Sequence, residues 1–447
     1  MSLSLWKTDD PAFRERLAGL KRQLSLDEGL KAPAHEGEPP REAVRRIIED
    51  VRRRGDQAVL EYTERFDGCA LEAGQLRVRP DEIEAALARC PDDLLAVLRK
   101  AADRIERFQR AMLLQDPEPL REGGRTLAVR YRPVDSAAVY APGAAASLAS
   151  SVLMSAVPAK VAGVPRVVLA TPARPDGTIS DDRLVAAHVA GVHEIYRLGG
   201  AVAVAALAYG TETVPAVDFI AGPGNIYLAL AKKEVFGQVG IEMLPGPSEV
   251  IVIADGSADA RWLAADLIAQ AEHNPGSAIL LTPSEELARR VVEAVEAQLA
   301  DLPGAGEARG CLERYGAVIV AESMDECVRL TNELAPEHLE IVTERPEDVL
   351  AGIRHAGAVF LGPWTPVAAG DYIAGPSHVL PTGTTARFSS GLSANDFLKR
   401  FSVISYDRPA LGEDAPDIAR MARSEGLEGH ARSVELRAPR GDTVQGV

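Results

Sequence analysis

Acidic, amide and imidazole side chains gather in four short segments that could do chemistry. The first is residues 265–277, ADLIAQAEHNPGS, whose apolar spacing and abrupt Asn-Pro-Gly stop predict the last turns of a buried helix. Gln270 and His273 lie one turn apart on that helix and therefore face the same space. They could share a metal ion, but at this spacing alone a hydrogen-bonded helix end is the commoner outcome.

Three further segments each set an acid near a histidine. They are residues 334–341 with Glu337 and His338, residues 370–381 with Asp371 and His378, and residues 425–430 with Glu425 and His430. Nitrogen and oxygen ligands of these types suit a borderline metal such as zinc. The candidate ligands are Gln270, His273, Asp371 and His430, although no spacing rule singles out these four.

Glu337 and His338 are candidates for proton transfer. An imidazole has a suitable pKa for general base work near neutrality, and a glutamate can join it when desolvated. The pair follows Pro336 at the start of an expected strand, where neighbouring side chains face opposite sides. Both can serve one site only if the chain bends at that strand end.

Two glycine loops are candidates for holding a nucleotide. Residues 222–225, GPGN, open an expected helix, and the free N–H groups at such a start suit a phosphate. A glycine turn that simply caps the helix is an equally good interpretation. Residues 199–201, GGA, have the same status. No GxGxxG fingerprint follows an expected strand, which counts against an ordinary dinucleotide fold.

The elements that must position these residues alternate along the chain. Residues 11–115 show helical periodicity, with residues 10–11, Asp-Pro, as a cap. A first series has expected strands at 137–140, 167–170 and 219–220 and helices at 151–161, 182–190, 201–209 and 226–236. A second series has strands at 249–254, 279–281, 317–320, 339–342 and 358–361 and helices at 258–273, 285–299 and 324–334. Such alternation predicts βαβ sheets covered by helices.

The predicted fold is therefore α/β, with two consecutive Rossmann-like lobes that are incomplete because they lack GxGxxG. A helical N-terminal lobe is expected over residues 1–123, the first α/β lobe over 124–247 and the second over 248–386. Residues 387–447 form a small tail domain, with one strand at 401–406 and two short helices around 426–435. This tail has little core of its own, so we expect it to pack on another lobe or subunit.

Composition excludes several classes of protein. The chain has 447 residues and a formal net charge of −16, which argues against a nucleic-acid partner. Residues 1–10 have no apolar core for a signal peptide, and proline and glycine break the uncharged stretch 136–159, so no membrane association is expected. The four cysteines form no CxxC pair, which favours a reduced, cytoplasmic protein.

Taken together, the motifs closely resemble the histidinol dehydrogenase family. They are residues 222–225 (GPGN), 246–249 (GPSE), 270–273 (QAEH), 335–339 (APEHL), 369–372 (AGDY) and 377–381 (SHVLP). The likeness runs in order from about residue 50 to about residue 437. It implies oxidation of L-histidinol to L-histidine through L-histidinal, the last steps of histidine biosynthesis, with NAD as hydride acceptor and one zinc ion per subunit.

The resemblance also implies roles for individual residues. The zinc ligands would be Gln270, His273, Asp371 and His430, the last coming from the partner subunit of a homodimer with intertwined C-terminal tails. Substrate would be held by Ser248, His338, Glu425 and these metal-site residues, with His378 nearby. His338 would take the alcohol proton, and Glu337 would activate water for the second oxidation. Tyr140 and Asn225 match the NAD contacts, which places NAD on the first lobe.

The chain departs from the family at two places near the expected cofactor. Val202 stands where the family usually has glutamine, so one side-chain hydrogen bond to NAD is lost, which weakens binding by about tenfold at most. Residues 142–144, Pro-Gly-Ala, lack a second glycine that is common there, and no consequence follows from this.

Four alternatives stay open. A relative with the same scaffold could oxidise a sulfonated diol, although the carboxylate of Glu425 would repel a sulfonate. A thiol-dependent aldehyde dehydrogenase needs an activated cysteine, and neither Cys90 nor Cys327 lies in a setting that activates it. A zinc hydrolase would need no NAD. A metal-stabilised scaffold without activity would tolerate the loss of Glu337 and His338.

Overall fold

The computed structural model describes residues 3–25, 38–143, 148–273 and 276–438. The chain forms two compact units, which are considered separately. The first unit comprises Met1–Met112 and Val134–Phe397, and the second comprises Leu113–Pro133 and Leu398–Val447. In the described residues no helix is both long enough and apolar enough to cross a membrane.

One parallel sheet of the first unit has the strand order β6-β5-β4-β7-β8. Its strands are β4 (Ser136–Tyr140), β5 (Arg166–Thr171), β6 (Glu194–Arg197), β7 (Phe219–Ala221) and β8 (Gly240–Ile241). The helices between them are α7 (Ala149–Val161), α8 (Asp181–Val189), α9 (Gly200–Tyr209) and α10 (Ile226–Val235). Counted along the chain, the strand order is 3-2-1-4-5, the arrangement of doubly wound nucleotide-binding sheets.

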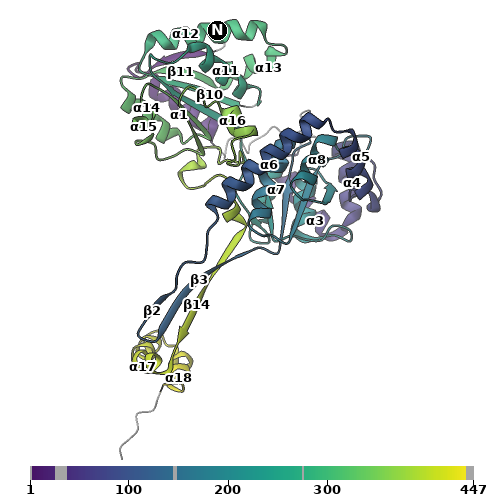
Figure 1. The fold of residues 1–447 in the computed structure, drawn as a ribbon, viewed down its shortest axis with the longest axis vertical. Helices are drawn as coiled ribbons and strands as arrows, with labels where there is room; N and C mark the ends of the chain where they lie inside the picture. The colour runs from purple at the N-terminus through teal and green to yellow at the C-terminus, as the bar shows by residue number, and fades with distance from the viewer. Residues whose placement is uncertain (1–2, 26–37, 144–147, 274–275, 439–447) are drawn as a thin grey trace, which may run out of the picture. The chain divides into compact units, whose positions relative to one another are not determined.

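The second parallel sheet has the order β1-β11-β10-β9-β12-β13. Figure 1 labels its neighbouring strands β10 and β11. Its strands are β1 (Ser4–Lys7), β9 (Ser248–Ala254), β10 (Gly276–Thr282), β11 (Gly316–Val320), β12 (His338–Val342) and β13 (Ala358–Leu361). Its helices are α11 (Ala260–Ala271), α12 (Glu285–Asp301), α13 (Ala305–Tyr315), α14 (Met324–Leu334), α15 (Pro346–Leu350) and α16 (Val367–Tyr372). Without β1 this sheet repeats the 3-2-1-4-5 order. The predicted α/β class is confirmed.

The N-terminal segment differs from the predicted separate helical lobe over residues 1–123. Strand β1 pairs in parallel with β11, and α1 (Phe13–Leu24) packs on the same sheet. Helices α3 (Pro40–Arg54) and α4 (Asp56–Asp67) instead share a core with α9 and α10. The physical reason is that each helix has one apolar face, which must be covered by a sheet layer because the segment has no core of its own.

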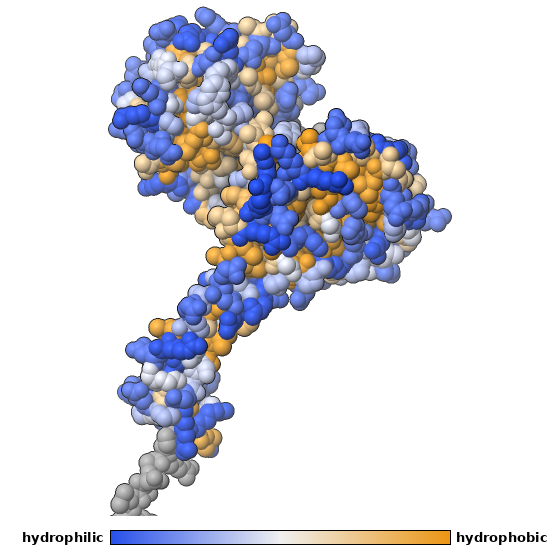
Figure 2. All heavy atoms as spheres, in the orientation of Figure 1, coloured by the Kyte–Doolittle hydropathy of each residue, from blue (hydrophilic) through white to orange (hydrophobic). Residues whose placement is uncertain are grey.

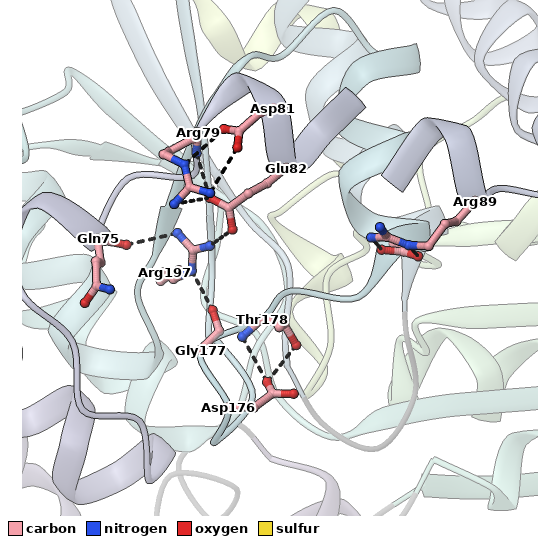
Figure 3. Close-up of polar contacts among 10 residues, drawn as sticks. Gln75, Arg79, Asp81, Glu82, Arg89, Asp176, Gly177, Thr178 and Arg197 are labelled. Carbon is pink, nitrogen blue, oxygen red and sulfur yellow. Dashed lines mark hydrogen bonds and ion pairs between the residues drawn. The ribbon is translucent and has the colours of Figure 1, made fainter. Parts of the chain in front are cut away.

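A buried arginine anchors the next part of this segment to the first sheet. Figure 3 shows Arg197, at the end of β6, donating to the carbonyl oxygen of Gln75 at 2.9 Å and to that of Gly177 at 2.7 Å. It also pairs with Glu82, on α5 (Pro80–Arg89). Helix α6 (Asp92–Met112) follows α5 and packs against α7 and α8. Arg197 is 5% exposed, so its guanidinium satisfies groups that water barely reaches.

The second unit is a three-stranded antiparallel sheet with two helices. Its strand order is β14-β3-β2, with β2 (Leu120–Glu122), β3 (Arg125–Pro133) and β14 (Leu398–Tyr406). Helix α18 (Glu428–Glu435) lies where a helix was expected. The sequence predicted two short helices around residues 426–435, and only α18 lies there. The other helix, α17 (Arg408–Ser424), precedes that range and is longer than predicted. Asp407 caps α17 by accepting from the backbone N–H of Ala410.

Replacing Arg197 should destabilise the first unit. Arg197→Met would leave the carbonyls of Gln75 and Gly177 and Oε1 of Glu82 without their donor, so we expect the free energy of unfolding to fall by about 2–3 kcal/mol. The measurement is urea denaturation followed by circular dichroism. Arg89→Ala is the control, because the Arg89–Asp181 pair is largely exposed and should matter little. Equal effects of the two substitutions would contradict this assignment.

Candidate active site

The two proton-transfer candidates sit at a bend before a strand. Helix α14 ends at Ala335, whose φ of 47° is left-handed, and Pro336 then prevents the helix from continuing. Strand β12 begins at His338, so Glu337 lies just outside the regular alternation of the strand. The side chains of Glu337 and His338 can therefore reach one site, as the irregular strand end expected from the sequence requires.

The backbone of one residue holds both of these side chains. The N–H of Glu249, on neighbouring strand β9, donates to Oε2 of Glu337 at 2.9 Å. The carbonyl oxygen of Glu249 lies 3.0 Å from Nδ1 of His338. The hydroxyl of Ser248 also donates to Oε2 of Glu337, at 2.6 Å. Since β9 and β12 are paired in register, these contacts fix the two side chains against a rigid sheet.

This geometry determines the tautomer of His338. A carbonyl oxygen only accepts hydrogen bonds, so Nδ1 must carry the proton and Nε2 must carry the lone pair. Nε2 is buried without a hydrogen-bond partner in the described residues, and Oδ1 of Asp371 lies 3.8 Å from it. Burial lowers the pKa of the imidazole, which is only 3% exposed. His338 is therefore neutral near pH 7 and can accept a proton at Nε2.

Burial has the opposite effect on the neighbouring acids. It raises the pKa of Glu337 to about 7, against the hydrogen bonds from Ser248 and Glu249 that lower it. It also raises the pKa of Glu249 well above its usual range, and the nearby Glu337 carboxyl adds to this. The Glu249 side chain accepts from the N–H of Gly383 at 2.9 Å. A group with a pKa near 7 can act as an acid or a base at neutral pH.

The end of α11 lies beside this pair. The helix stops at Ala271, and a Cβ on Gly276 would lie 2.5 Å from the Gln270 carbonyl oxygen and 2.6 Å from that of His273, so only glycine fits there. Gly276 is the register partner of Ser248, which brings this helix end to the start of β9. The predicted stop residues 274–275 lie outside the described residues, whereas Gln270 and His273 are described.

The side chains of Gln270 and His273 make no hydrogen bond to other described residues. Nε2 of Gln270 is buried without a partner, in a residue 5% exposed. Desolvation lowers the pKa of His273, and the nearby Glu337 carboxyl partly opposes this effect. The imidazole is therefore neutral and available as a ligand.

Helix α16 brings Asp371 to the same place. The N–H of Val367, at the start of α16, donates to Oε1 of Glu340 at 2.9 Å. Burial, followed by the nearby Asp266 carboxyl, raises the pKa of Glu340 to about 8. Glu340 thus ties α16 to β12. Burial also raises the pKa of Asp371, while the imidazole of His338 lowers it.

His378 supports Asp371 rather than facing the solvent. Its Nδ1 lies 2.9 Å from the Asp371 carbonyl oxygen, and its Nε2 lies 3.2 Å from the hydroxyl of Ser151 on α7. Burial lowers the pKa of His378 to about 4, so the ring is neutral. With both nitrogens used, His378 orients the end of α16 and is poorly placed to act as a base.

The donor set of this site fits a divalent cation of the zinc type. A neutral imidazole, a carboxamide and a carboxylate come from His273, Gln270 and Asp371, and the buried carboxamide would bind a metal through its oxygen. In the described part of the chain, no three His, Cys, Asp or Glu side chains are grouped to hold a metal ion. Of the predicted ligands that are His, Cys, Asp or Glu, the first unit contains His273 and Asp371. A complete zinc coordination shell would therefore need a further ligand besides these two and Gln270.

A separate cavity lies at the carboxyl ends of the first sheet. It has a volume of about 570 Å³ and is lined by Tyr140, Asn225, Val202, Gly199 and Gly200, among others. The N–H of Gly200 donates to the Tyr140 hydroxyl at 3.0 Å, so that hydroxyl has its own proton left for a ligand. The switch point of a 3-2-1-4-5 sheet is where nucleotides bind, so this cavity fits a dinucleotide.

Asn225 serves partly as a helix cap. Its Oδ1 accepts from the N–H groups of Tyr227 and Leu228, at 3.1 and 3.2 Å. The side-chain oxygen of Asn225 thus caps the helix, as one of the two interpretations of the GPGN loop predicted. The side-chain amide nitrogen of Asn225 could still donate to a ligand. A Cβ on Gly222 would lie 2.3 Å from the Tyr140 carbonyl oxygen, so the loop packs directly on β4.

Not every predicted residue belongs to this site within the first unit. Ser248, Glu337, His338, Asp371 and His378 are linked by the contacts above. Glu425 and His430 lie on the second unit, with exposed side chains, and their roles stay predictions. Sequence reasoning missed the parts played by Glu249 and Glu340. The motif around Glu249 was recognised, but backbone hydrogen bonds carry no signal in side-chain identity.

The cysteines do not fit a thiol-dependent mechanism. Cys69, Cys311 and Cys327 are buried, and none of the four cysteines is in a disulfide. Burial raises the pKa of all four thiols, that of Cys327 to about 12. A nucleophilic cysteine needs a lowered pKa, so these thiols are protonated and unreactive near neutrality.

Comparison with known proteins agrees with this geometry. The histidinol dehydrogenase family profile matches residues 31–438. The histidinol dehydrogenase of a Synechococcus strain is 52% identical over 396 residues, which cover 88% of this chain and 91% of that protein. The histidinol dehydrogenase of Syntrophotalea carbinolica is 49% identical over 428 residues, which cover 94% and 99%. The crystal structure of histidinol dehydrogenase from Elizabethkingia anophelis matches with a TM-score of 0.88 at 34% identity and covers 98% of each chain. The chain therefore belongs to the histidinol dehydrogenase family and is an oxidoreductase.

Proposed function

We propose that this enzyme oxidises L-histidinol to L-histidine through L-histidinal, in the last steps of histidine biosynthesis, with NAD as hydride acceptor and one zinc ion per subunit. The observation that carries this proposal is the pairing of two groups: Nε2 of the neutral His338, which has no hydrogen-bond partner among the described residues, and a carboxyl of pKa about 7 on Glu337. The free thiols are compatible with a reducing compartment such as the cytoplasm.

Four residues would hold the zinc ion, and each offers a suitable donor atom. They are Gln270, His273, Asp371 and His430, the last from a partner subunit. When bound, the metal would orient the imidazole and amine of the amino alcohol. Ser248 and His378 then support this shell, since they fix Glu337 and the end of α16 respectively. Glu425 adds a carboxylate suited to a cationic substrate and unsuited to a sulfonated one.

His338 and Glu337 would divide the proton transfers. In the first oxidation Nε2 of His338 accepts the alcohol proton as the hydride leaves for NAD, and the contact of Nδ1 with Glu249 stabilises the imidazolium that results. In the second oxidation the carboxylate of Glu337 takes a proton from the water that adds to the aldehyde. A dehydrogenase of this kind explains both groups, whereas a zinc hydrolase would leave His338 and the first-lobe cavity without a role.

The NAD would lie in the first-lobe cavity. Tyr140 offers its hydroxyl proton and Asn225 its amide nitrogen. Val202 lines the cavity without a polar atom, which fits weaker binding than in relatives with glutamine there.

A homodimer with intertwined tails would cover the second unit. Strand β14 is exposed along Lys399–Tyr406, and Phe401 and Ile404, which face opposite sides, are 50% and 69% exposed. Apolar residues are visible on this unit in Figure 2. Its buried cluster consists of Ala419, Ala422 and Ala431, which is a small core for an independent unit. A second copy of the chain is the occupant that also delivers His430.

The direct test of the function is incubation of the purified chain with L-histidinol and NAD. We expect two equivalents of reduced cofactor per histidinol, followed by absorbance, and loss of activity on treatment with a chelator that zinc restores. Turnover without NAD would favour the hydrolase. Absence of any turnover with zinc-loaded protein would leave a metal-stabilised scaffold as the better interpretation.

Replacing Glu337 should affect the second step more than the first. Glu337→Gln keeps the acceptor for Ser248 but cannot take a proton, so L-histidinal oxidation should fall about a hundredfold or more and L-histidinol oxidation much less. The carboxylate is the active form and its pKa is about 7, so aldehyde oxidation by the unmodified enzyme should rise as the pH increases through 7. This rise should be absent in the variant.

Glu344→Gln is the matched control for this measurement. Glu344 follows the same strand at its other end, is exposed and should leave both steps unchanged. Equal losses for alcohol and aldehyde in Glu337→Gln would contradict the division of labour.

Replacing His430 should remove zinc without unfolding the chain. His430→Asn should lower the zinc content measured by atomic absorption, while the exposed control His193→Asn should not. Co-expression of His430→Asn with Glu337→Gln gives heterodimers in which one site has both intact residues, provided that His430 acts across the dimer. Aldehyde oxidation should then recover partly. Full zinc occupancy in His430→Asn, or no recovery in the mixture, would refute this placement.

A further inference from the structure

An isolated carboxylate lines the first-lobe cavity beside its glycine loop. Asp67 is the last residue of α4, and Gly68, with φ of 66°, ends the helix. A Cβ on Gly199 would lie 2.8 and 3.0 Å from the two carboxylate oxygens of Asp67, so the carboxylate lies directly over that glycine. Among the described residues no hydrogen bond or ion pair reaches this carboxylate.

Asp67 is placed at a cost in three respects. A negative charge at a helix C-terminus faces the negative end of the helix dipole. The side chain is half-buried, and desolvation raises its pKa to about 6. Finally, no donor among the described residues offsets that burial. Such a group usually reflects a functional requirement rather than a structural one.

The other charged side chains in the cavity lining do not form an ion pair with Asp67. Glu38 is paired with Arg46 at 2.8 Å, and Arg46 also donates to the Tyr62 hydroxyl. Arg65 and Arg174 line the cavity as well, but neither is paired with Asp67 in the contacts that the structure gives. Asp67 is therefore the acid left to accept hydrogen bonds from a ligand.

A complementary donor lies close to Asp67. The buried Tyr140 hydroxyl accepts from Gly200, so its proton is free to be donated, and the charge of Asp67 acts on it. A carboxylate acceptor beside a hydroxyl donor matches a ribose diol, which has two hydroxyls to donate and oxygen lone pairs to accept. Phe66, next to Asp67 in the cavity wall, is 46% exposed and offers an apolar face on which an adenine ring could stack.

We infer that Asp67 binds the adenosine ribose diol of the dinucleotide and makes the enzyme select NAD over NADP. A 2′-phosphate would replace one donor hydroxyl with a dianion next to the carboxylate, which repels it. This inference rests on the proposed use of NAD but not on zinc, histidinol or the second unit. Arg174 is the feature that works against it, because a guanidinium could accept the extra phosphate.

The test is isothermal titration calorimetry of the full chain with NAD, NADP and ADP-ribose. We expect the unmodified chain to bind NAD and ADP-ribose at least tenfold more tightly than NADP. Asp67→Asn should weaken NAD binding by about tenfold to a hundredfold without weakening NADP binding, so the preference should collapse. Glu64→Gln, on the same helix but outside the cavity lining, should change neither affinity.

Further measurements separate this role from a structural one. The melting temperature of Asp67→Asn should not fall, because the change removes a desolvated charge that none of the described residues pairs with. Asp67→Glu should lose NAD affinity and still reject NADP, since the charge remains while the geometry changes. Unchanged NAD affinity in Asp67→Asn, or preference of the unmodified chain for NADP, would overturn the inference alone. Failure of the unmodified chain to bind any of the three ligands would overturn the proposed cofactor as well.

Discussion

The site depends on the two hydrogen bonds made by the backbone of a single residue. The N–H of Glu249 positions the carboxyl of Glu337, and its carbonyl oxygen sets the tautomer of His338. Both groups belong to the peptide frame of β9, which is paired in parallel with β12. Because the frame of a central strand is rigid, the active nitrogen and the active carboxyl keep a fixed separation, and side-chain substitutions at position 249 would leave both bonds in place.

The two parallel sheets share a strand order but use opposite edges. The cavity of the first sheet lies at its carboxyl edge, where Tyr140 and the glycine loops meet, as is usual for nucleotide-binding folds. In the second sheet Ser248 and His338 are the first residues of β9 and β12, so the acid–base groups lie at the amino edge. At its carboxyl edge Asp255 accepts from the N–H of Glu344 and joins the ends of the same two strands.

Much of this fold could be predicted because buried parallel strands are short apolar runs separated by helices. The segments that form β9 and β12 show this pattern. The edge strand β1 could not be predicted, because four residues pair with β11 more than 300 positions away. Helical spacing predicted Gln270 and His273 on one helix face, but α11 ends at Ala271, so His273 lies just beyond the helix. Glu249 contributes through its backbone atoms, and Asp67 belongs to no motif. The role of neither residue could therefore be predicted from the sequence. His430 and Glu425 were noted from the sequence as an acid near a histidine, but the partner-subunit role of His430 and the substrate role of Glu425 came only from the resemblance.

Burial acts on the two side chains proposed for proton transfer in opposite directions, and each direction suits one of the two proposed oxidations. Removing water disfavours the charged form, which for His338 is the cation and for Glu337 is the anion. The imidazole is thus kept as a base at neutral pH, while the carboxyl is balanced between its two states. Taking up a proton makes His338 a cation 3.5 Å from Oε2 of Glu337, which favours the carboxylate. In the proposed mechanism, the first proton transfer would therefore favour the carboxylate that acts as the base in the second oxidation.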